Sequence, residues 1–160
     1  MNQTVSVQDL PGVSGQVLPP SSWMEISQER VNGFADATND HQFIHVDPAR
    51  AAATPFGSTI AHGFLTLSLL SHLVMESFIR VEGTRMALNY GLDRVRFIHP
   101  VAVGSRIRSQ QKIVDAQDKG GGRWVLKTEV TVEIEGVAKP AMLAEFLMMI
   151  ITAPQSEGAR

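Results

Sequence analysis

The sequence has 160 residues, 44% of them hydrophobic, with a formal net charge of −2 and no cysteine. A chain of this length is expected to form one domain that buries about two thirds of its unfolded surface. The nearly balanced charge gives no reason to expect nucleic acid as a partner, and the lack of cysteine excludes disulfides and thiolate zinc sites.

The N-terminal residues 1–15 are polar, contain proline and glycine, and are predicted to form an irregular arm. They show no basic region followed by an apolar one, so we expect no secretory signal and a cytoplasmic protein. The segment 16–27 is extended, but Pro19 and Pro20 restrict it to a sheet edge or a bend. We find no repeat or linker that would divide the chain, so residues 1–160 are predicted to be a single domain.

A first helix is predicted over residues 28–38. Ser27 is a plausible N-cap, because its hydroxyl can accept a hydrogen bond from an unpaired amide of the first turn. Behind it Val31, Phe34 and Thr38 recur at helical spacing, and Asn-Asp then follows, as is typical of a chain leaving a helix.

The next segment contains two titratable residues, Asp40 and His45. Five residues apart, they would be separated by about 140° on an α-helix and would lie on opposite faces of a strand. They can converge only if the backbone turns between them. Asp47 and Pro48 then resemble an N-cap followed by proline at the first helical position. We therefore expect His45 in a loop between two helices.

The most apolar stretch of the chain is residues 62–79, which we interpret as one helix at the core of the fold. Only a narrow stripe around Ser68, Ser71 and His72 lacks apolar side chains, which indicates a helix buried nearly all round. Polar residues interrupt any run of roughly 18 apolar residues, so no membrane contact is expected. Gly63 in the first turn would let a ligand carbonyl approach the backbone amides, or it would serve helix packing.

After this helix the pattern changes to strands. Alternating or continuous apolar runs are found in four stretches, with turn signals between the last three. These stretches are residues 85–104, 105–117, 121–135 and 137–152. Locally connected strands after one buried helix predict an α+β fold in which a bent antiparallel sheet wraps around the helix.

No sharp motif for phosphate binding, serine hydrolysis or zinc proteolysis occurs in the sequence. His41 and His45 have the i, i+4 spacing of a zinc pair, but no third ligand of a fitting type is obvious, so no metal is predicted.

Taken together, the central segment resembles the MaoC-like dehydratase family, which includes the (R)-specific enoyl-CoA hydratases. The family pattern is an aromatic residue, a patch of small residues, Asp-x-Asn-Pro-aliphatic-His, and then a His-Gly pair that opens the central helix. Here Phe34, the segment 35–38, the segment 40–45 and the pair 62–63 match it. Gln-Phe replaces the usual Asn-Pro, as in the branch that is similar to nodulation protein N. The segment RVRFIHPVAVGSRI also looks like a strand pair of the family, so the resemblance covers residues from about 25 to 150.

The resemblance implies a hotdog fold, a homodimer, and reversible hydration of trans-2-enoyl-CoA to (R)-3-hydroxyacyl-CoA. It implies that Asp40 and His45 hold one water between them, that Gly63 and His62 contact the thioester substrate, and that Ser71 supports the dyad. Which member of the dyad is the base stays open. No cofactor is implied, since coenzyme A is part of the substrate.

Two alternatives on the same fold are a hotdog acyl-CoA thioesterase and a non-catalytic acyl-CoA-binding protein. Hotdog thioesterases generally lack this Asp-x4-His arrangement before a His-Gly helix, which favours the hydratase.

Overall fold

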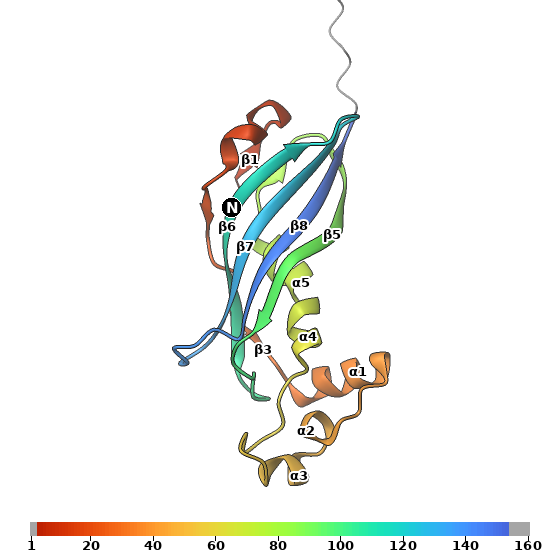
Figure 1. Ribbon diagram of the computed structural model, residues 1–160, viewed down its shortest axis with the longest axis vertical. Coiled ribbons are helices and arrows are strands. Elements are labelled where there is room, and N and C mark those ends of the chain that lie inside the picture. Colours follow the sequence, from red (N-terminus) through yellow and green to blue (C-terminus); the bar gives the residue numbers. More distant parts are fainter. Residues whose placement is uncertain (1–2, 154–160) are drawn as a thin grey trace, which may run out of the picture.

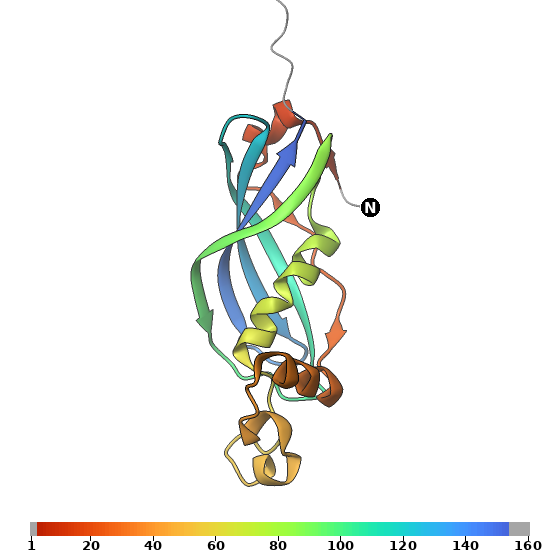
Figure 2. The ribbon, with the colours of Figure 1, turned by 90° about the vertical axis from the view of Figure 1, so that its right-hand side faces the viewer.

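The computed structural model describes residues 3–153, so the two ends of the predicted domain, 1–2 and 154–160, lie outside the described part. An antiparallel sheet curves around helices at its centre (Figures 1 and 2). The elements in chain order are β1 (Thr4–Val5), a 3-10 helix (Val7–Val13), β2 (Val17–Leu18), β3 (Met24–Glu25), α1 (Gln28–Thr38), α2 (Phe43–Val46), α3 (Pro48–Ala52), α4 (Gly63–Ser68), α5 (Leu70–Ser77), β4 (Arg80–Val81), β5 (Thr84–Phe97), β6 (Arg106–Asp118), β7 (Arg123–Ile134) and β8 (Met142–Thr152). The predicted α+β class is confirmed.

The main sheet has six strands in the order β2-β6-β7-β8-β5, and β3 also pairs with β6. The four long strands lie where the sequence patterns predicted them. The expected local connectivity fails at β5, which pairs with β8 and not with β6. The reason is the intervening chain, which does not turn back as a hairpin. The chain between β5 and β6 runs instead alongside the segment that precedes α4. There the Ala61 amide donates a hydrogen bond to the Val101 carbonyl at 2.8 Å.

The N-terminal arm is more regular than predicted. Residues 4–13 form β1, which pairs in parallel with β4, and then a 3-10 helix. Leu10 and Val13 of this helix are buried in the core. The prediction of an irregular arm was therefore wrong for this part, because two apolar side chains give the segment a surface to pack on.

The first helix has the predicted limits. The Ser27 side chain accepts a hydrogen bond from the Arg30 amide, which confirms the expected cap. At the other end Asn39 adopts a left-handed conformation with φ of 58°, and this turns the chain out of α1. The second expected cap is also present, because the Asp47 side chain accepts from the Arg50 amide at the start of α3.

The central helix differs from its prediction in two ways. The stretch 62–79 forms two helices, α4 and α5, interrupted at Leu69, where ψ is −13°. One face packs into the sheet, and Leu73 is completely buried there. The opposite face is open, since Phe64 is 68% and Met75 is 46% exposed. The helix is therefore buried on one side and not nearly all round.

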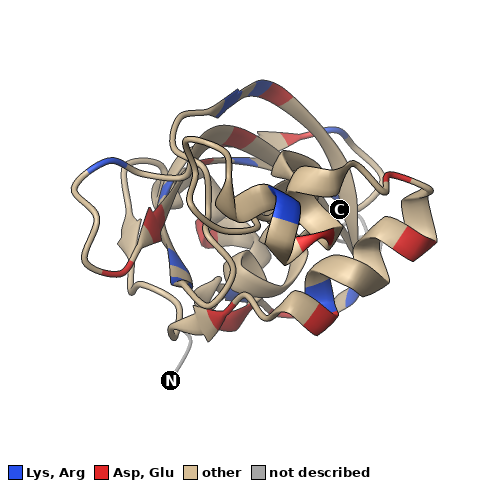
Figure 3. Cartoon of the chain, turned by 90° about the horizontal axis from the view of Figure 1, so that it is seen from below, with Lys and Arg blue, Asp and Glu red and all other residues tan. Residues whose placement is uncertain are grey.

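Two surface properties follow from this arrangement. Among the helices of residues 3–153, none combines the length and the hydropathy that crossing a membrane requires. Lysine and arginine are interspersed with acidic residues around the end of the molecule that carries α1 to α3 (Figure 3). No extended field of one sign is visible on that end.

Candidate active site

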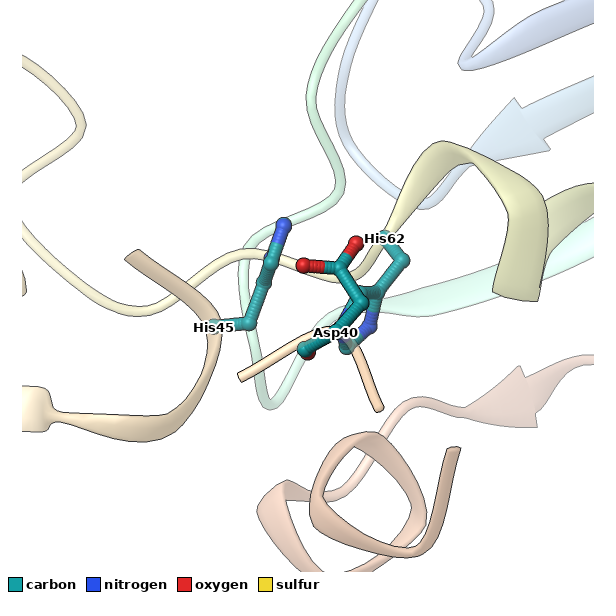
Figure 4. A group of neighbouring side chains, drawn as sticks. All are labelled: Asp40, His45 and His62. Atoms are coloured by element: carbon teal, nitrogen blue, oxygen red, sulfur yellow. The ribbon is translucent and has the colours of Figure 1, made fainter. Parts of the chain in front are cut away.

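Three predicted site residues come together at the end of the molecule where α4 begins. One carboxylate or imidazole atom from each of Asp40, His45 and His62 lies within 4.8 Å of the others (Figure 4). The required change of direction between Asp40 and His45 is present, because residues 40–42 are irregular and the new helix α2 begins at Phe43. His45 itself lies in the short helix α2 and not in a loop, since the Asp47 amide donates to the Phe43 carbonyl and closes a helical turn.

The hydrogen bonds of His45 fix which ring nitrogen carries its proton. Its Nδ1 lies 2.7 Å from the carbonyl oxygen of Ile60. A carbonyl oxygen only accepts, so Nδ1 must donate, and the neutral ring then has a free lone pair on Nε2. Burial lowers the pKa of His45 below its ordinary value of 6.5, against an opposing effect of the bond to Ile60. At neutral pH His45 is thus an uncharged base.

His62 contacts both Asp40 and His45. Its ring stacks on His45 with centroids 3.8 Å apart, and Phe34 packs on it at 5.0 Å. Its Nε2 lies 2.9 Å from the backbone carbonyl of Asp40, to which it must donate. His62 is 2% exposed. It contacts both members of the dyad, and its expected contact with the substrate stays a prediction.

The cluster of Asp40, His45 and His62 also has the residue types of a metal site, including the third ligand that the sequence did not reveal. Its geometry does not suit an ion. The two imidazole rings are stacked with centroids 3.8 Å apart and planes inclined by only 26°, so their lone pairs lie in nearly parallel planes and do not point at one ion. A zinc ion needs nitrogen ligands at about 2.0–2.1 Å along those lone pairs.

A cavity of about 340 Å³ opens beside His45. Gly63 and Thr66 line it on the side of α4, and its remaining walls are largely apolar. Those walls are formed by Phe56, Ile60, Ala61, Phe97, Ile98, His99, Pro100, Val101 and Ala141. A Cβ atom added to Gly63 would lie 3.2 Å from the Phe97 ring. Glycine at this position therefore keeps the first turn of α4 open to the cavity while Phe97 packs on it.

Several residues of the site were not found by sequence reasoning. Thr66 is buried, lines the cavity one turn beyond Gly63, and forms no side-chain hydrogen bond with any residue in 3–153. Its i+3 spacing from Gly63 was a signal that could have identified it. His99 lines the cavity from the chain that follows β5, and no local pattern indicated this.

Ser71 lies away from the dyad. Its hydroxyl accepts a hydrogen bond from the Asn89 side chain of β5 at 2.8 Å. Within residues 3–153 its hydroxyl forms no hydrogen bond with Asp40 or His45, and its expected support of the dyad stays a prediction. His41 is also separate, because its ring pairs with Asp36 at the surface at 2.8 Å.

Comparison with known sequences gives consistent matches over most of the chain. The family described as MaoC like domain matches residues 10–136. The chain is 51% identical over 146 residues to 3-hydroxyacyl-thioester dehydratase Z of Mycobacterium tuberculosis, covering 91% of this chain and 96% of that protein. It is 49% identical over 147 residues to nodulation protein N of Rhizobium leguminosarum, covering 91% of both.

Solved structures give the same fold. A MaoC-like dehydratase from Rhodospirillum rubrum aligns with a TM-score of 0.74 at 15% identity and covers 94% of this chain and 99% of that one. The (R)-hydratase from A. caviae aligns with a TM-score of 0.66 at 24% identity and covers 88% and 96%. These similarities confirm the expected hotdog fold.

Proposed function

The chain belongs to the MaoC-like domain family and is a hydratase or dehydratase, and we propose that it adds water reversibly to trans-2-enoyl-CoA to give (R)-3-hydroxyacyl-CoA. Its similarity to a 3-hydroxyacyl-thioester dehydratase supports a thioester substrate. The largely apolar cavity beside His45 supports an acyl group as the part that is bound there.

The observation that carries the proposal is the uncharged His45 beside the Asp40 carboxylate. A ring nitrogen of His45 and a carboxylate oxygen of Asp40 lie within 4.8 Å of each other, a span that one water hydrogen-bonded to both groups can bridge. Because Nδ1 of His45 is committed to Ile60, the free Nε2 is the atom that accepts a proton from this water. This assigns the role of base to His45 and leaves Asp40 to orient the water and to stabilise the imidazolium.

The proposed step then balances without a cofactor. One O–H bond of the water breaks as its oxygen bonds to the β-carbon, and the proton moves to Nε2 of His45. The electron pair of the double bond shifts toward the α-carbon and the thioester oxygen, and His45 returns the proton to the α-carbon. Dehydration follows the same path in reverse.

The charge that develops on the thioester oxygen needs a hydrogen-bond donor. We assign this role to the Gly63 amide at the start of α4, which has no backbone partner among residues 3–153. Gly63 lines the same cavity as His45, so one bound thioester can reach both.

We further propose that the enzyme works as a homodimer. The edge strand β5 exposes apolar side chains, and so does the outer face of α4 and α5. Those with large exposure are Phe64, Met75, Met86, Leu88, Tyr90 and Leu92. The two elements form one face, because Phe64 packs near Phe97 and Ser71 bonds to Asn89. An apolar face at an unpaired sheet edge is typical of an interface.

The test is turnover of crotonyl-CoA by the purified protein, followed by loss of the conjugated enoyl absorbance. We expect Asp40→Asn and His45→Gln each to abolish turnover. His41→Gln is the matched control, since His41 is a surface histidine nearby whose ring pairs outside the site, and this variant should retain activity.

Absence of hydration for every acyl length tested, with folded wild-type protein, would overturn the proposal. Release of free thiol without water addition would instead indicate the thioesterase. Acyl-CoA binding that is unchanged in Asp40→Asn, without any turnover, would indicate the non-catalytic binder.

A further inference from the structure

We infer that Gln28 and Thr59 are positioning residues that hold His45 in the tautomer and orientation in which it acts as the base. This inference rests on the proposed function for its catalytic consequence. Neither side chain lines the cavity, so neither is expected to touch the substrate.

The side-chain amide of Gln28 joins two segments of the site. Its Nε2 donates to the backbone carbonyl of His45 at 2.7 Å, and its Oε1 accepts from the Thr59 hydroxyl at 2.6 Å. Thr59 is only 4% exposed, so water does not compete freely for this bond. Gln28 therefore fixes the distance between the backbone of α2 and the segment that contains Thr59.

The neighbouring residue Ile60 completes a closed ring of hydrogen bonds. Its carbonyl accepts from His45 Nδ1 at 2.7 Å, and its amide donates to the Ile44 carbonyl at 3.0 Å. The imidazole is thus held by Ile60 at one end, while Gln28 and Thr59 hold the backbone from which it projects. A shift of Thr59 would move Ile60 with it and weaken the bond that sets the His45 tautomer.

The segments that contain Thr59 and Gln28 both hydrogen-bond to residues 103–104, in the chain between β5 and β6. The Val103 amide donates to the Thr59 carbonyl at 2.9 Å, and the Gly104 amide donates to the Ile26 carbonyl at 2.8 Å, just before α1 begins. Gln28, in the first turn of α1, and Thr59 are therefore held relative to the same short segment. Such an arrangement favours a fixed relative position, which a general base requires.

The role is specific to the base, because loss of the Nδ1 bond would allow the other tautomer. In that tautomer Nε2 carries the proton and cannot accept one from water. The expected consequence is a lower kcat with little change in KM, since substrate contacts stay intact.

The experiment compares Thr59→Val, which removes the hydroxyl at nearly constant shape, with Thr59→Ser, which keeps it. We expect Thr59→Val to lower kcat for crotonyl-CoA hydration about 10- to 100-fold with KM within about twofold, and Thr59→Ser to restore most of the rate. Gln28→Leu should have a similar effect. The double variant should be no slower than the slower single variant, because both residues act through one ring.

Thr84→Val is the control, since the Thr84 hydroxyl bonds to the Val81 carbonyl far from the site. A second measurement does not depend on activity. Nitrogen-15 NMR of the histidine rings, with His45→Gln used for assignment, should show His45 as the Nδ1–H tautomer in the wild type and a mixture of tautomers in Thr59→Val.

Two results would overturn the inference: an unchanged tautomer in Thr59→Val, or equal kinetics for the valine and serine variants. Failure of the proposed function is separate from this. It would appear as an inactive wild type, in which the NMR comparison still decides whether Thr59 and Gln28 position His45.

Discussion

The site end of the molecule and the face formed by β5 are built on opposite principles. At the site end His45 is buried and hydrogen-bonded, since it is 7% exposed and both its ring and its carbonyl have partners. On the β5 face the side chains are apolar and open, with Tyr90 56% exposed. The described groups of the first region come from one chain, whereas we propose that a partner covers the apolar surface of the second.

The two regions are stabilised by different kinds of interaction. Hydrogen bonds are directional, so the hydrogen bonds of Gln28, Thr59 and Ile60 around His45 define one geometry of the imidazole. Burial of apolar surface is not directional and scales with area, so the proposed interface at β5 would be stabilised only by contact with a second surface. Substitutions can therefore perturb assembly and chemistry separately.

The largest expected effect is on assembly. Tyr90→Asp places a charge in the centre of the proposed interface, and burial of an unpaired charge is costly. We expect dimer dissociation to become at least about 100-fold more favourable, measured by sedimentation at several concentrations. Val17→Asp is the control, because Val17 is an exposed apolar residue, at 71%, on the opposite edge of the sheet. Equal dimerisation of both variants would contradict an interface at β5.

The next effect tests the support beneath the dyad. His62→Phe keeps a ring that can stack on His45 but removes the donor to the Asp40 carbonyl. We expect kcat to fall about tenfold while the protein stays folded and dimeric, because Asp40 loses one of the contacts that hold it. Steady-state kinetics with crotonyl-CoA and sedimentation measure both properties. A loss of dimer alone would show that His62 has no specific link to the chemistry.

A smaller effect should distinguish two glycines, one in each region. Gly63→Ala adds a methyl group 3.2 Å from the Phe97 ring at the cavity, and we expect kcat/KM to fall several-fold as Phe97 shifts. In Gly91→Ala the added carbon meets only Leu147 at an ordinary contact of 3.9 Å, so kinetics should be unchanged. Equal kcat/KM values for the two variants would show that the close packing at Gly63 does not affect catalysis.

The features that the sequence could predict depend on contacts within a short stretch of chain. The caps at Ser27 and Asp47 were correct because an N-cap depends on contacts within one turn. The four long strands were correct because alternation is a local pattern. The approach of Asp40 to His45 followed from the family pattern together with the need for a turn.

What the sequence did not predict depends on contacts between distant segments. The pairing of β5 with β8 and the bond from Thr59 to Gln28, which are 31 residues apart, have no local signature. The exposure of Phe64 could not be predicted either, since an apolar residue at an interface looks the same in sequence as one in a core. The partner of Ser71 could not be predicted for the same reason, because Asn89 lies on β5.

The smallest expected effect is on pH dependence, and it tests the site end alone. Burial lowers the pKa of His45 below 6.5 in the folded protein. The unfolded chain then binds more protons than the folded one as the pH falls below 6.5, so stability should decrease from about that pH toward the lowered pKa and be unaffected by His45 above it.

The acid limb of kcat/KM should likewise have its midpoint below 6.5, since the base must be neutral. NMR titration of His45 in the wild type gives the direct measurement, and a midpoint at or above 6.5 would contradict a buried, uncharged base. Tyr90→Asp should leave this midpoint unchanged if the site is complete within one chain, whereas a shift toward 6.5 would show that the partner helps to keep water from His45.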